Sequence, residues 1–404
     1  MINTTQRSRT MSVLICFLVF FLLIFSNCQQ ASNRSVQIDT IELYRVDVEK
    51  VRHFSHSTWQ NRQHVFLKLS SESYAGWSET IADKNNPRLD IRRWGYFLLD
   101  LKGRTLDEAF DLLEQRRKGG TWEKRQLEFT ELALIDLAAH TEGISANEYL
   151  GLTGDEPVPG LFTILEDNPV KVAEQAQLAK EQGFTSHIKI KLFGNQQLDQ
   201  QVIEQVRKVM GPAAFILGDV NRGYTSFETL DDLAVILRSL YDNGLDACED
   251  PAELTNRQWV ALQYKVGDLA LVPDRPTRTS WLALDSLVPD MGRYYNMHPA
   301  GLGSIRHMIP VTEQIKEWGH GIMIGDASLI GPGCSAWQQL AIGVGASWVE
   351  AIEKPQENDV FLKATVSQAT FRENDLIDMK PQPGFGLEVD DQFLKRMADD
   401  YCSL

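Results

Sequence analysis

The sequence is short of positive charge. Its 404 residues carry 40 Lys and Arg against 55 Asp and Glu, a formal net charge of −15. An acidic surface argues against nucleic acid or an anionic membrane as a partner, because both repel negative charge. A small anionic ligand stays open, since a few local lysines or a metal ion govern such a site.

Cysteine is also scarce. The five cysteines stand at positions 16, 28, 248, 334 and 402, and the first two lie in a leader. The other three are too widely spaced for a paired metal-ligand pattern or a disulfide framework. Cys248 falls within an expected strand, where we expect a small core residue. Internal repeats and low-complexity tracts are likewise missing.

Long apolar runs are missing except for Met11 to Phe25. Arg7 and Arg9 precede this run, so residues 1–33 are expected to be a signal peptide or membrane anchor. The run is shorter than the ~20 residues of a spanning helix. The protein is therefore expected to be exported, as a periplasmic or cell-envelope protein that touches the membrane only through this leader. Lipid attachment at Cys28 is the weaker alternative, because Asn27 precedes it.

The remaining residues suggest two domains. Residues 34–156 read as an α+β capping domain with a strand near His64–Leu69 and a helix over Leu127–Glu142. Two polar stretches, His53–Arg62 and Ile81–Arg92, are expected to be loops. Such loops often carry binding residues.

Residues 157–355 alternate strand and helix. Eight strands are expected to begin near Phe162, His187, Phe215, Leu245, Leu269, Arg293, Ile322 and Ser347. Thr225–Glu228 is expected to be the capping box of one intervening helix. Eight strands suffice for a closed (β/α) barrel. Residues 356–404 form a polar C-terminal segment.

One strand is unusual because it carries two lysines on one face. In His187–Leu192 the apolar residues alternate with Lys189 and Lys191. An amphipathic strand with solvated lysines is the plain interpretation. Inside a barrel, however, paired lysines require an anion.

Three carboxylates each follow a short apolar strand in successive units: Asp219, Glu249 and Asp274. The C-terminal ends of parallel strands form the sites of such barrels. Carboxylates that converge there repel one another unless a hard cation joins them.

These motifs together resemble the enolase superfamily, on its muconate-lactonising and mandelate-racemase side. The matching pieces are Lys189-Ile-Lys191, Asp219-Val-Asn221, Glu249-Asp-Pro251, Asp274 and Asn296-Met-His-Pro-Ala-Gly-Leu-Gly303. Gly76-Trp-Ser-Glu79 is similar to the family's Gly-Trp-Gly-Glu. The resemblance implies an α/β fold, a modified (β/α)7β barrel of the (β/α)8 type. It also implies an α+β cap, to which residues 356–404 return.

The resemblance also implies the chemistry. Family members remove the proton next to a carboxylate and stabilise the resulting ene-diolate with Mg²⁺, for which Mn²⁺ is the alternative here. Asp219, Glu249 and Asp274 correspond to the metal ligands, and Lys191 to the base. Lys189 would lower the pKa of Lys191 and help to hold the carboxylate. Asn221 is either a polar contact near the metal or a turn residue.

Two positions depart from the family pattern. Arg275 stands where a Glu is frequent, and it would pair with the metal carboxylates, bind a second acidic group of the substrate, or form a rim ion pair. His298 stands where the muconate-lactonising branch has a lysine. A proton transfer that uses two lysines is therefore in doubt.

The mandelate-racemase branch instead pairs an Asp and a His on the sixth and seventh strands. His298 and Asp326 would form that dyad with the two residue types exchanged, and the carboxylate would raise the pKa of the imidazole. Alternatively, His298 lies in a loop and Asp326 caps a helix. Glu350, on the eighth strand, would hydrogen-bond the substrate carboxylate.

Two classes of function remain open. The first is a racemase, epimerase, dehydratase or cycloisomerase of a small carboxylic acid, with a homo-oligomer compatible with the family. The second is an exported, non-catalytic metal- or ligand-binding relative.

Overall fold

The computed structural model describes residues 36–54, 57–278, 287–353 and 359–404. The expected leader lies outside these residues. Within the described ranges, no helix has both the length and the apolar character needed to cross a membrane.

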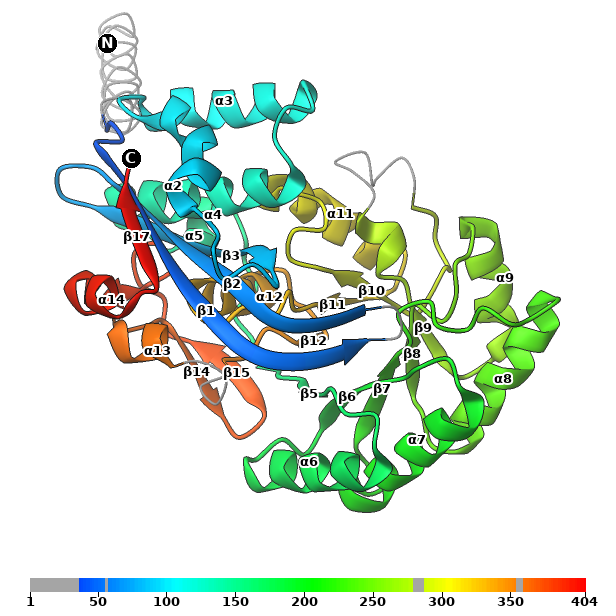
Figure 1. Cartoon of the computed structure of the whole chain (residues 1–404). Helices are drawn as coiled ribbons and strands as arrows, with labels where there is room; N and C mark the ends of the chain where they lie inside the picture. Colours follow the sequence, from blue (N-terminus) through cyan, green and yellow to red (C-terminus); the bar gives the residue numbers. More distant parts are fainter. Residues whose placement is uncertain (1–35, 55–56, 279–286, 354–358) are drawn as a thin grey trace, which may run out of the picture.

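The capping domain is built on an antiparallel sheet in the order β17-β1-β2-β3 (Figure 1). Its strands are β1 (Thr40–Phe54), β2 (Ser57–Ser70), β3 (Ala75–Lys84) and β17 (Asp400–Ser403). Helices α2 (Ile91–Trp94), η1 (Gly95–Leu101), α3 (Leu106–Lys118), α4 (Lys124–Glu142) and α5 (Ala146–Tyr149) accompany it. Helix α4 lies so close to β3 that a Cβ on Gly76 would stand 2.1 Å from the Ala133 carbonyl oxygen.

The stretch His53–Arg62 is not the loop that its composition suggested. β1 runs to Phe54 and β2 starts at Ser57, with Arg52 opposite Trp59 and Phe54 opposite Ser57. Exposure alternates along the start of β2, because one face of this hairpin meets solvent. That explains both the polar composition and the wrong prediction. Similarly, β3 extends into the second expected loop, up to Lys84.

Eight parallel strands form the barrel in two arcs. The first comprises β5 (Phe162–Ile164), β6 (His187–Lys191), β7 (Phe215–Asp219), β8 (Ala247–Glu249) and β9 (Ala270–Val272). The second comprises β10 (Tyr294–Met297), β11 (Gly321–Ile324) and β12 (Trp348–Val349). The Asn296 N–H donates to the Pro273 carbonyl (3.0 Å), and the Leu161 N–H donates to the Val349 carbonyl (2.8 Å). These bonds join the arcs at both seams and close the barrel.

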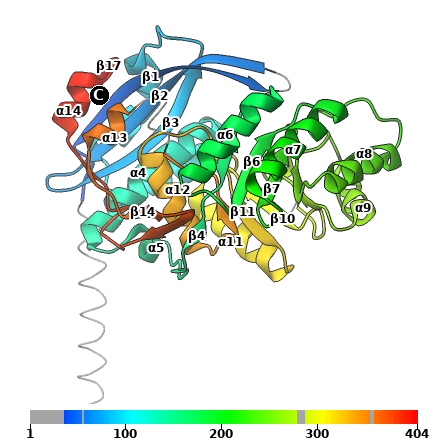
Figure 2. The same ribbon diagram turned by 90° about the horizontal axis from the view of Figure 1, so that it is seen from below.

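Helices cover the outside of the barrel (Figures 1 and 2). They are α6 (Pro169–Glu181), α7 (Gln196–Met210), α8 (Leu230–Asp242), α9 (Asn256–Val266), α11 (Ile305–Glu317) and α12 (Pro332–Gly343). The connection from β9 to β10 begins with the 3₁₀ helix η2 (Arg275–Arg278). After β12 the described chain resumes at α13 (Val360–Ala364), where Phe361 packs on Phe66 of the cap. The predicted (β/α)7β barrel with an α+β cap is confirmed.

The capping box of α8 is displaced from the predicted one. Thr229 and Asp232 form it, and α8 begins at Leu230. Thr225–Glu228 also fits the capping-box pattern. The helix starts at the later box, because Leu233, Leu237 and Leu240 then lie together on its buried face.

The C-terminal segment contains β13 (Thr365–Ser367), β14 (Thr370–Glu373), β15 (Leu376–Met379), β16 (Glu388–Val389) and α14 (Asp391–Met397). β15 pairs with β4 (Val158–Pro159), just ahead of the barrel, and β17 pairs with β1, placing Cys402 opposite Leu43. The segment therefore touches both the barrel entrance strand and the cap.

Aromatic side chains close the N-terminal end of the barrel. Trp348, the first residue of β12, packs on Tyr294 with ring centroids 4.3 Å apart and on Phe215 with centroids 5.0 Å apart. The opposite, C-terminal end of the strands is left for the site.

Candidate active site

A cavity of about 770 Å³ lies where the barrel strands end and the cap hairpin reaches over them. The barrel contributes the lysines and carboxylates singled out above, while β1, β2 and β3 contribute Arg52, Phe54, Trp59 and Lys84. The cavity therefore brings together two segments that the sequence keeps far apart.

The strand register places Lys191, Asp219 and Glu249 at the same level along the barrel axis. Lys191 is the neighbour of Asp219 on β7, and Asp219 is the neighbour of Glu249 on β8. Asp274 follows two residues after the end of β9. Lys189 and Lys191 are 3% and 7% exposed, so they are not the solvated lysines of an ordinary amphipathic strand.

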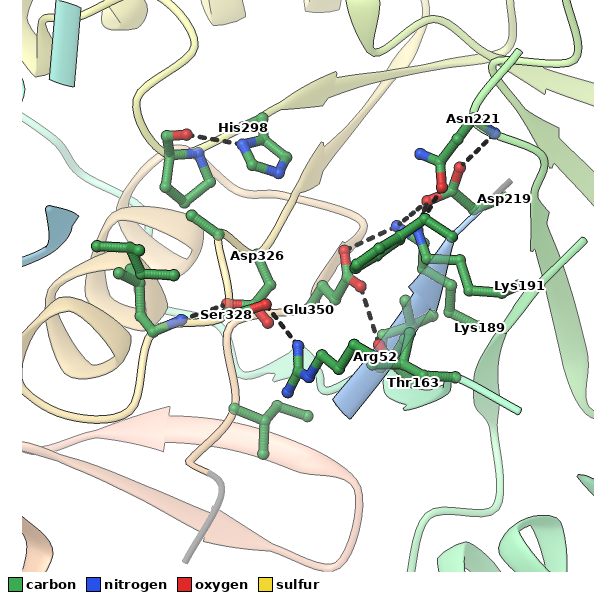
Figure 3. Close-up of a pocket in the computed structure, with 18 of the residues that line it drawn as sticks. Arg52, Thr163, Lys189, Lys191, Asp219, Asn221, His298, Asp326, Ser328 and Glu350 are labelled. Carbon is green, nitrogen blue, oxygen red and sulfur yellow. Dashed lines mark hydrogen bonds and ion pairs between the residues drawn. The ribbon is translucent and has the colours of Figure 1, made fainter. Parts of the chain in front are cut away.

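Lys189 lies among three acids (Figure 3). Its Nζ is 2.8 Å from Glu249 Oε2, 2.9 Å from Glu350 Oε2 and 3.2 Å from Asp219 Oδ2. Burial alone would lower the pKa of Lys189, but Glu249, Glu350 and Asp219 raise it well above its ordinary value. Lys189 therefore stays charged and holds the carboxylates together.

Lys191 points into the same cavity (Figure 3). Its Nζ donates to Asp219 Oδ2 at 2.5 Å and to Asn221 Oδ1 at 2.9 Å. It also lies 5.3 Å from the ring centroid of Phe54 in the cap hairpin. Asn221 has a positive φ of 48°, so it is both a turn residue and a polar contact of the lysine.

The acids of the cavity are not fully compensated. Burial and the neighbouring Asp219 raise the pKa of Glu249 well above its ordinary value, although Lys189 opposes the shift. Burial and Asp274 raise the pKa of Asp250 to about 7. Conversely, Lys191 and Lys189 overcome the effect of burial and lower the pKa of Asp219.

Asp274 is held by an arginine that the sequence analysis missed. Arg278 Nε donates to Asp274 Oδ1 at 2.6 Å, and Arg278 Nη2 donates to Asp274 Oδ2. Arg275, for which the sequence left three roles open, directs its backbone N–H to Asp250, and its side chain is exposed. The Asp-x-x-x-Arg spacing was the available signal, and η2 turns Arg278 back onto Asp274.

The donor set fits a hard divalent cation. Seven buried carboxylates line the cavity. Glu79 and Glu128 belong to the cap, and five belong to the barrel: Asp219, Glu249, Asp250, Asp274 and Glu350. Three cationic groups oppose them: Lys189, Lys191 and Arg278. Among these barrel residues the carboxylates outnumber the cationic groups by two, and all-oxygen ligands of this kind suit a hard divalent ion. No three His, Cys, Asp or Glu side chains of the described residues are arranged as a metal-ligand group. Lys189 and Arg278 form ion pairs with Glu249 and Asp274, two of the expected ligands.

The contacts recorded for the described His298 and Asp326 side chains differ from those of the predicted dyad. Both residues line the cavity (Figure 3), but His298 Nδ1 lies 2.7 Å from the Pro299 carbonyl oxygen. Asp326 Oδ1 accepts the Leu329 N–H at 3.1 Å. Burial and Arg278 lower the pKa of His298 to about 4, which is opposite in sign to the prediction. The imidazole is therefore neutral near pH 7.

Glu350 faces the cavity from β12, with both oxygens engaged. Oε2 contacts Lys189, and Oε1 accepts the Thr163 hydroxyl at 2.9 Å. A substrate carboxylate would therefore meet Glu350 only by replacing one of these partners.

Glu79 fixes the cap over the barrel. Its carboxylate accepts the backbone N–H groups of Ile330 (2.8 Å) and Gly331 (2.7 Å), which follow β11, and lies 2.7 Å from His64 Nδ1. Nearby, Arg52 Nη1 donates to Ser328 Oγ at 2.5 Å (Figure 3). The loop that carries Asp326 and the cap hairpin are thus joined directly.

With this geometry established, comparison with known proteins decides the family. A model described as enolase C-terminal domain-like matches residues 171–393, more than half of the chain. The chain belongs to the enolase superfamily. Its relatives place it with the mandelate-racemase and muconate-lactonising enzymes, as the motifs indicated.

Two curated relatives are epimerase and cycloisomerase members. The D-Ala-D/L-Ala epimerase of Cytophaga hutchinsonii is 32% identical over 120 residues, which span 30% of this chain and 31% of that protein. Muconate cycloisomerase 1 of Acinetobacter baylyi is 23% identical over 250 residues, 58% of this chain and 66% of the relative. These matches span less than two thirds of either relative.

A solved structure supports the superfamily fold over most of the chain. It is the dipeptide epimerase of Cytophaga hutchinsonii, complexed with Mg and the dipeptide D-Ala-L-Val. The two structures superpose with a TM-score of 0.75 at 17% identity, covering 91% of this chain and 99% of that one.

Proposed function

We propose that this superfamily member is a metal-dependent isomerase that removes the proton next to a substrate carboxylate. One observation carries the proposal: Lys191 stands in register with Asp219 on the inner face of the barrel, beside the carboxylates of β8 and the β9 end. Developing negative charge there meets preorganised positive charge.

Each side chain has a separate role in this reaction. Lys191, once its ammonium proton is lost, takes the α-proton, and Asn221 and Asp219 hold its Nζ in place. Lys189 binds a substrate carboxylate oxygen and keeps the acids in position. A Mg²⁺ or Mn²⁺ ion held by Asp219, Glu249 and Asp274 would supply further stabilisation of the ene-diolate charge.

His298 is assigned the proton transfer on the face of the substrate opposite Lys191. A neutral imidazole is able to accept a proton or pass one back, so Lys191 and His298 together would support racemisation or epimerisation. The resemblance to an epimerase and to a cycloisomerase supports an isomerase of either type. Dehydration is the remaining variant of the same first step.

A non-catalytic binding protein is the second candidate. The observation in its favour is that Lys189 and Arg278 already hold the acid oxygens through protein ion pairs. Such a protein would bind carboxylates without exchanging their protons.

The two candidates separate in one experiment. The purified protein is incubated in D₂O with a library of carboxylic acids and Mg²⁺ or Mn²⁺, and α-deuterium incorporation is followed by mass spectrometry. An isomerase incorporates deuterium into its substrate, and chelation with EDTA abolishes the incorporation. Binding of an acid that bears an exchangeable α-proton, without incorporation under any metal condition, would favour the binding protein.

A further inference from the structure

A further lysine, Lys84, faces the cavity from the cap. Lys84, the last residue of β3, places its Nζ 3.4 Å from the ring centroid of Trp59. Within the described part of the chain this cation–π interaction is the only contact of the Lys84 ammonium group, and no carboxylate lies within ion-pair distance of it there. The ammonium group is half-buried and lines the same cavity as Lys191.

The charges acting on Lys84 are all positive. Burial, Arg125, Arg62 and Arg278 together lower its pKa to about 8. Asp83, its neighbour in sequence, is turned to the side chain of Asn86 at 2.7 Å. A half-buried lysine that has cationic neighbours and no acid is a site for an anion from outside the protein.

More cations extend this surface between the cap and η2. Arg125 on α4 and Arg275 and Arg278 on η2 line the cavity, and Lys124 donates to the Arg278 carbonyl oxygen. Burial and Arg275 lower the pKa of Lys124, again through like charge. Glu128 on α4 also lines this side, but burial raises its pKa to about 8, so this carboxyl is uncharged near pH 7. The other rim acids lie elsewhere: Glu166 follows β5, and Glu353 follows β12. The cavity mouth is thus unequally charged.

Two aromatic rings connect the reacting centre with this cationic surface. Lys191 Nζ is 5.3 Å from the Phe54 centroid, Phe54 and Trp59 have centroids 4.5 Å apart, and Lys84 Nζ is 3.4 Å from Trp59. These three steps limit the separation of the two Nζ atoms to about 13 Å. With a contact of about 2.8 Å at Lys84 and a similar one at Lys191, a substrate fits whose distal anionic oxygen lies up to about 8 Å from the α-carbon beside Lys191.

We propose that Lys84, on the Phe54–Trp59 platform, binds a second anionic group of the substrate, so that the substrate class is an acid with two carboxylates joined by a short apolar chain. The reacting carboxylate lies at Lys189, and the α-carbon next to it faces Lys191. The linker covers the two rings, and the distal carboxylate meets Lys84 and Arg125. This inference rests on the proposed function for the identity of the reacting end only.

The test compares a diacid with its half ester. Binding of glutarate, adipate and pimelate and of their monomethyl esters is measured by calorimetry with saturating Mg²⁺ on the full chain without its leader. The wild type should bind the best diacid at least about fivefold more tightly than its half ester. This preference should decline as the pH rises through about 8, because Lys84 then loses its charge.

Three variants assign the preference to Lys84. Lys84→Met keeps the apolar stem over Trp59 and should bring the ratio of diacid to half-ester affinity close to one, whereas Lys84→Arg should preserve it. Lys171→Met, an exposed lysine on α6 away from the cavity, should leave the ratio as in the wild type. Circular dichroism confirms that each variant is folded.

The outcomes for the two proposals differ. Equal affinity of diacid and half ester in the wild type, no measurable binding of any diacid, or an unchanged ratio in Lys84→Met would overturn the second-anion site. A diacid preference that Lys84→Met removes supports this site. If that preference comes without α-deuterium incorporation into any diacid, it is the proposed function that fails.

Discussion

The Arg278 guanidinium donates hydrogen bonds to both carboxylate oxygens of Asp274, four residues before it. This pair occupies one of the three carboxylates that would hold a metal ion. Burial opposes ionisation, but Arg278 lowers the pKa of Asp274. Ion binding therefore competes with an internal cation at this carboxylate.

Removing that competitor should strengthen metal binding. We expect Arg278→Met to increase Mg²⁺ affinity about tenfold, equivalent to about 1.4 kcal/mol, because Asp274 loses its partner and the cavity gains net negative charge. Isothermal titration calorimetry measures the change. Arg275→Met, whose side chain is exposed, should bind Mg²⁺ as the wild type does. A weaker Mg²⁺ affinity in Arg278→Met would show that the arginine supports the site.

Glu249 should be essential for the ion. Glu249→Gln removes one charge from the centre of the carboxylate cluster and should weaken Mg²⁺ binding at least about tenfold. The same titration tests it, with Glu174→Gln on the exposed face of α6 as the control. An unchanged affinity would exclude Glu249 from the ligands.

Lys191 should be required for proton abstraction but not for the fold. Lys191→Ala is expected to lower α-deuterium incorporation by at least about a hundredfold, the usual contribution of a general base. Mg²⁺ affinity and the melting temperature are measured alongside, to show that the site survives. Exchange at the wild-type rate would contradict the assignment.

Glu128 on α4 should make stability depend on pH. Burial raises the pKa of this carboxyl to about 8, although it accepts the Ala300 N–H at 2.5 Å. The unfolded chain loses this proton near pH 4.5 and the folded chain only near pH 8, so stability falls as the pH rises between these values.

Glu128→Gln should remove most of this dependence. Relative to the wild type, we expect the variant to gain roughly 4 kcal/mol between pH 5 and pH 9, because over about three pH units of that range only the folded wild type keeps the proton. Urea unfolding at several pH values measures the change. Glu174→Gln again serves as the control. Parallel stability curves for Glu128→Gln and wild type would show that Glu128 does not titrate in this range.

The leader should direct export. We expect fractionation of the producing cells to place the protein in the periplasm or cell envelope, with a cytoplasmic enzyme as the marker of leakage. A full-length cytoplasmic form that retains Met1 to Phe25 would contradict this proposal.

The barrel and the central side chains were predictable because they depend on local patterns. Alternation in His187–Leu192 directs both lysines inward, and each carboxylate ends a short apolar strand. Parallel pairing then places Lys191, Asp219 and Glu249 side by side. No knowledge of distant contacts is needed for that step.

The missed features depend on contacts that local sequence does not encode. Lys84 ends an unremarkable strand, and only the pairing of β2 with β3 brings it over Trp59. The position of Arg278 depends on the 3₁₀ turn of η2. His298 and Asp326 stand on neighbouring strand ends, as predicted, but both side chains contact backbone groups.

The pairing of β1 with β17 has a consequence for the order of folding. These two strands come from opposite sides of the barrel sequence, so a ribosome must synthesise every barrel strand before the cap sheet is complete. Contacts of such long sequence separation form slowly. The barrel can assemble while β1 still lacks one neighbour, and that exposed edge is a template for pairing with other chains. Newly made protein is therefore most prone to aggregate in the interval before β17 arrives.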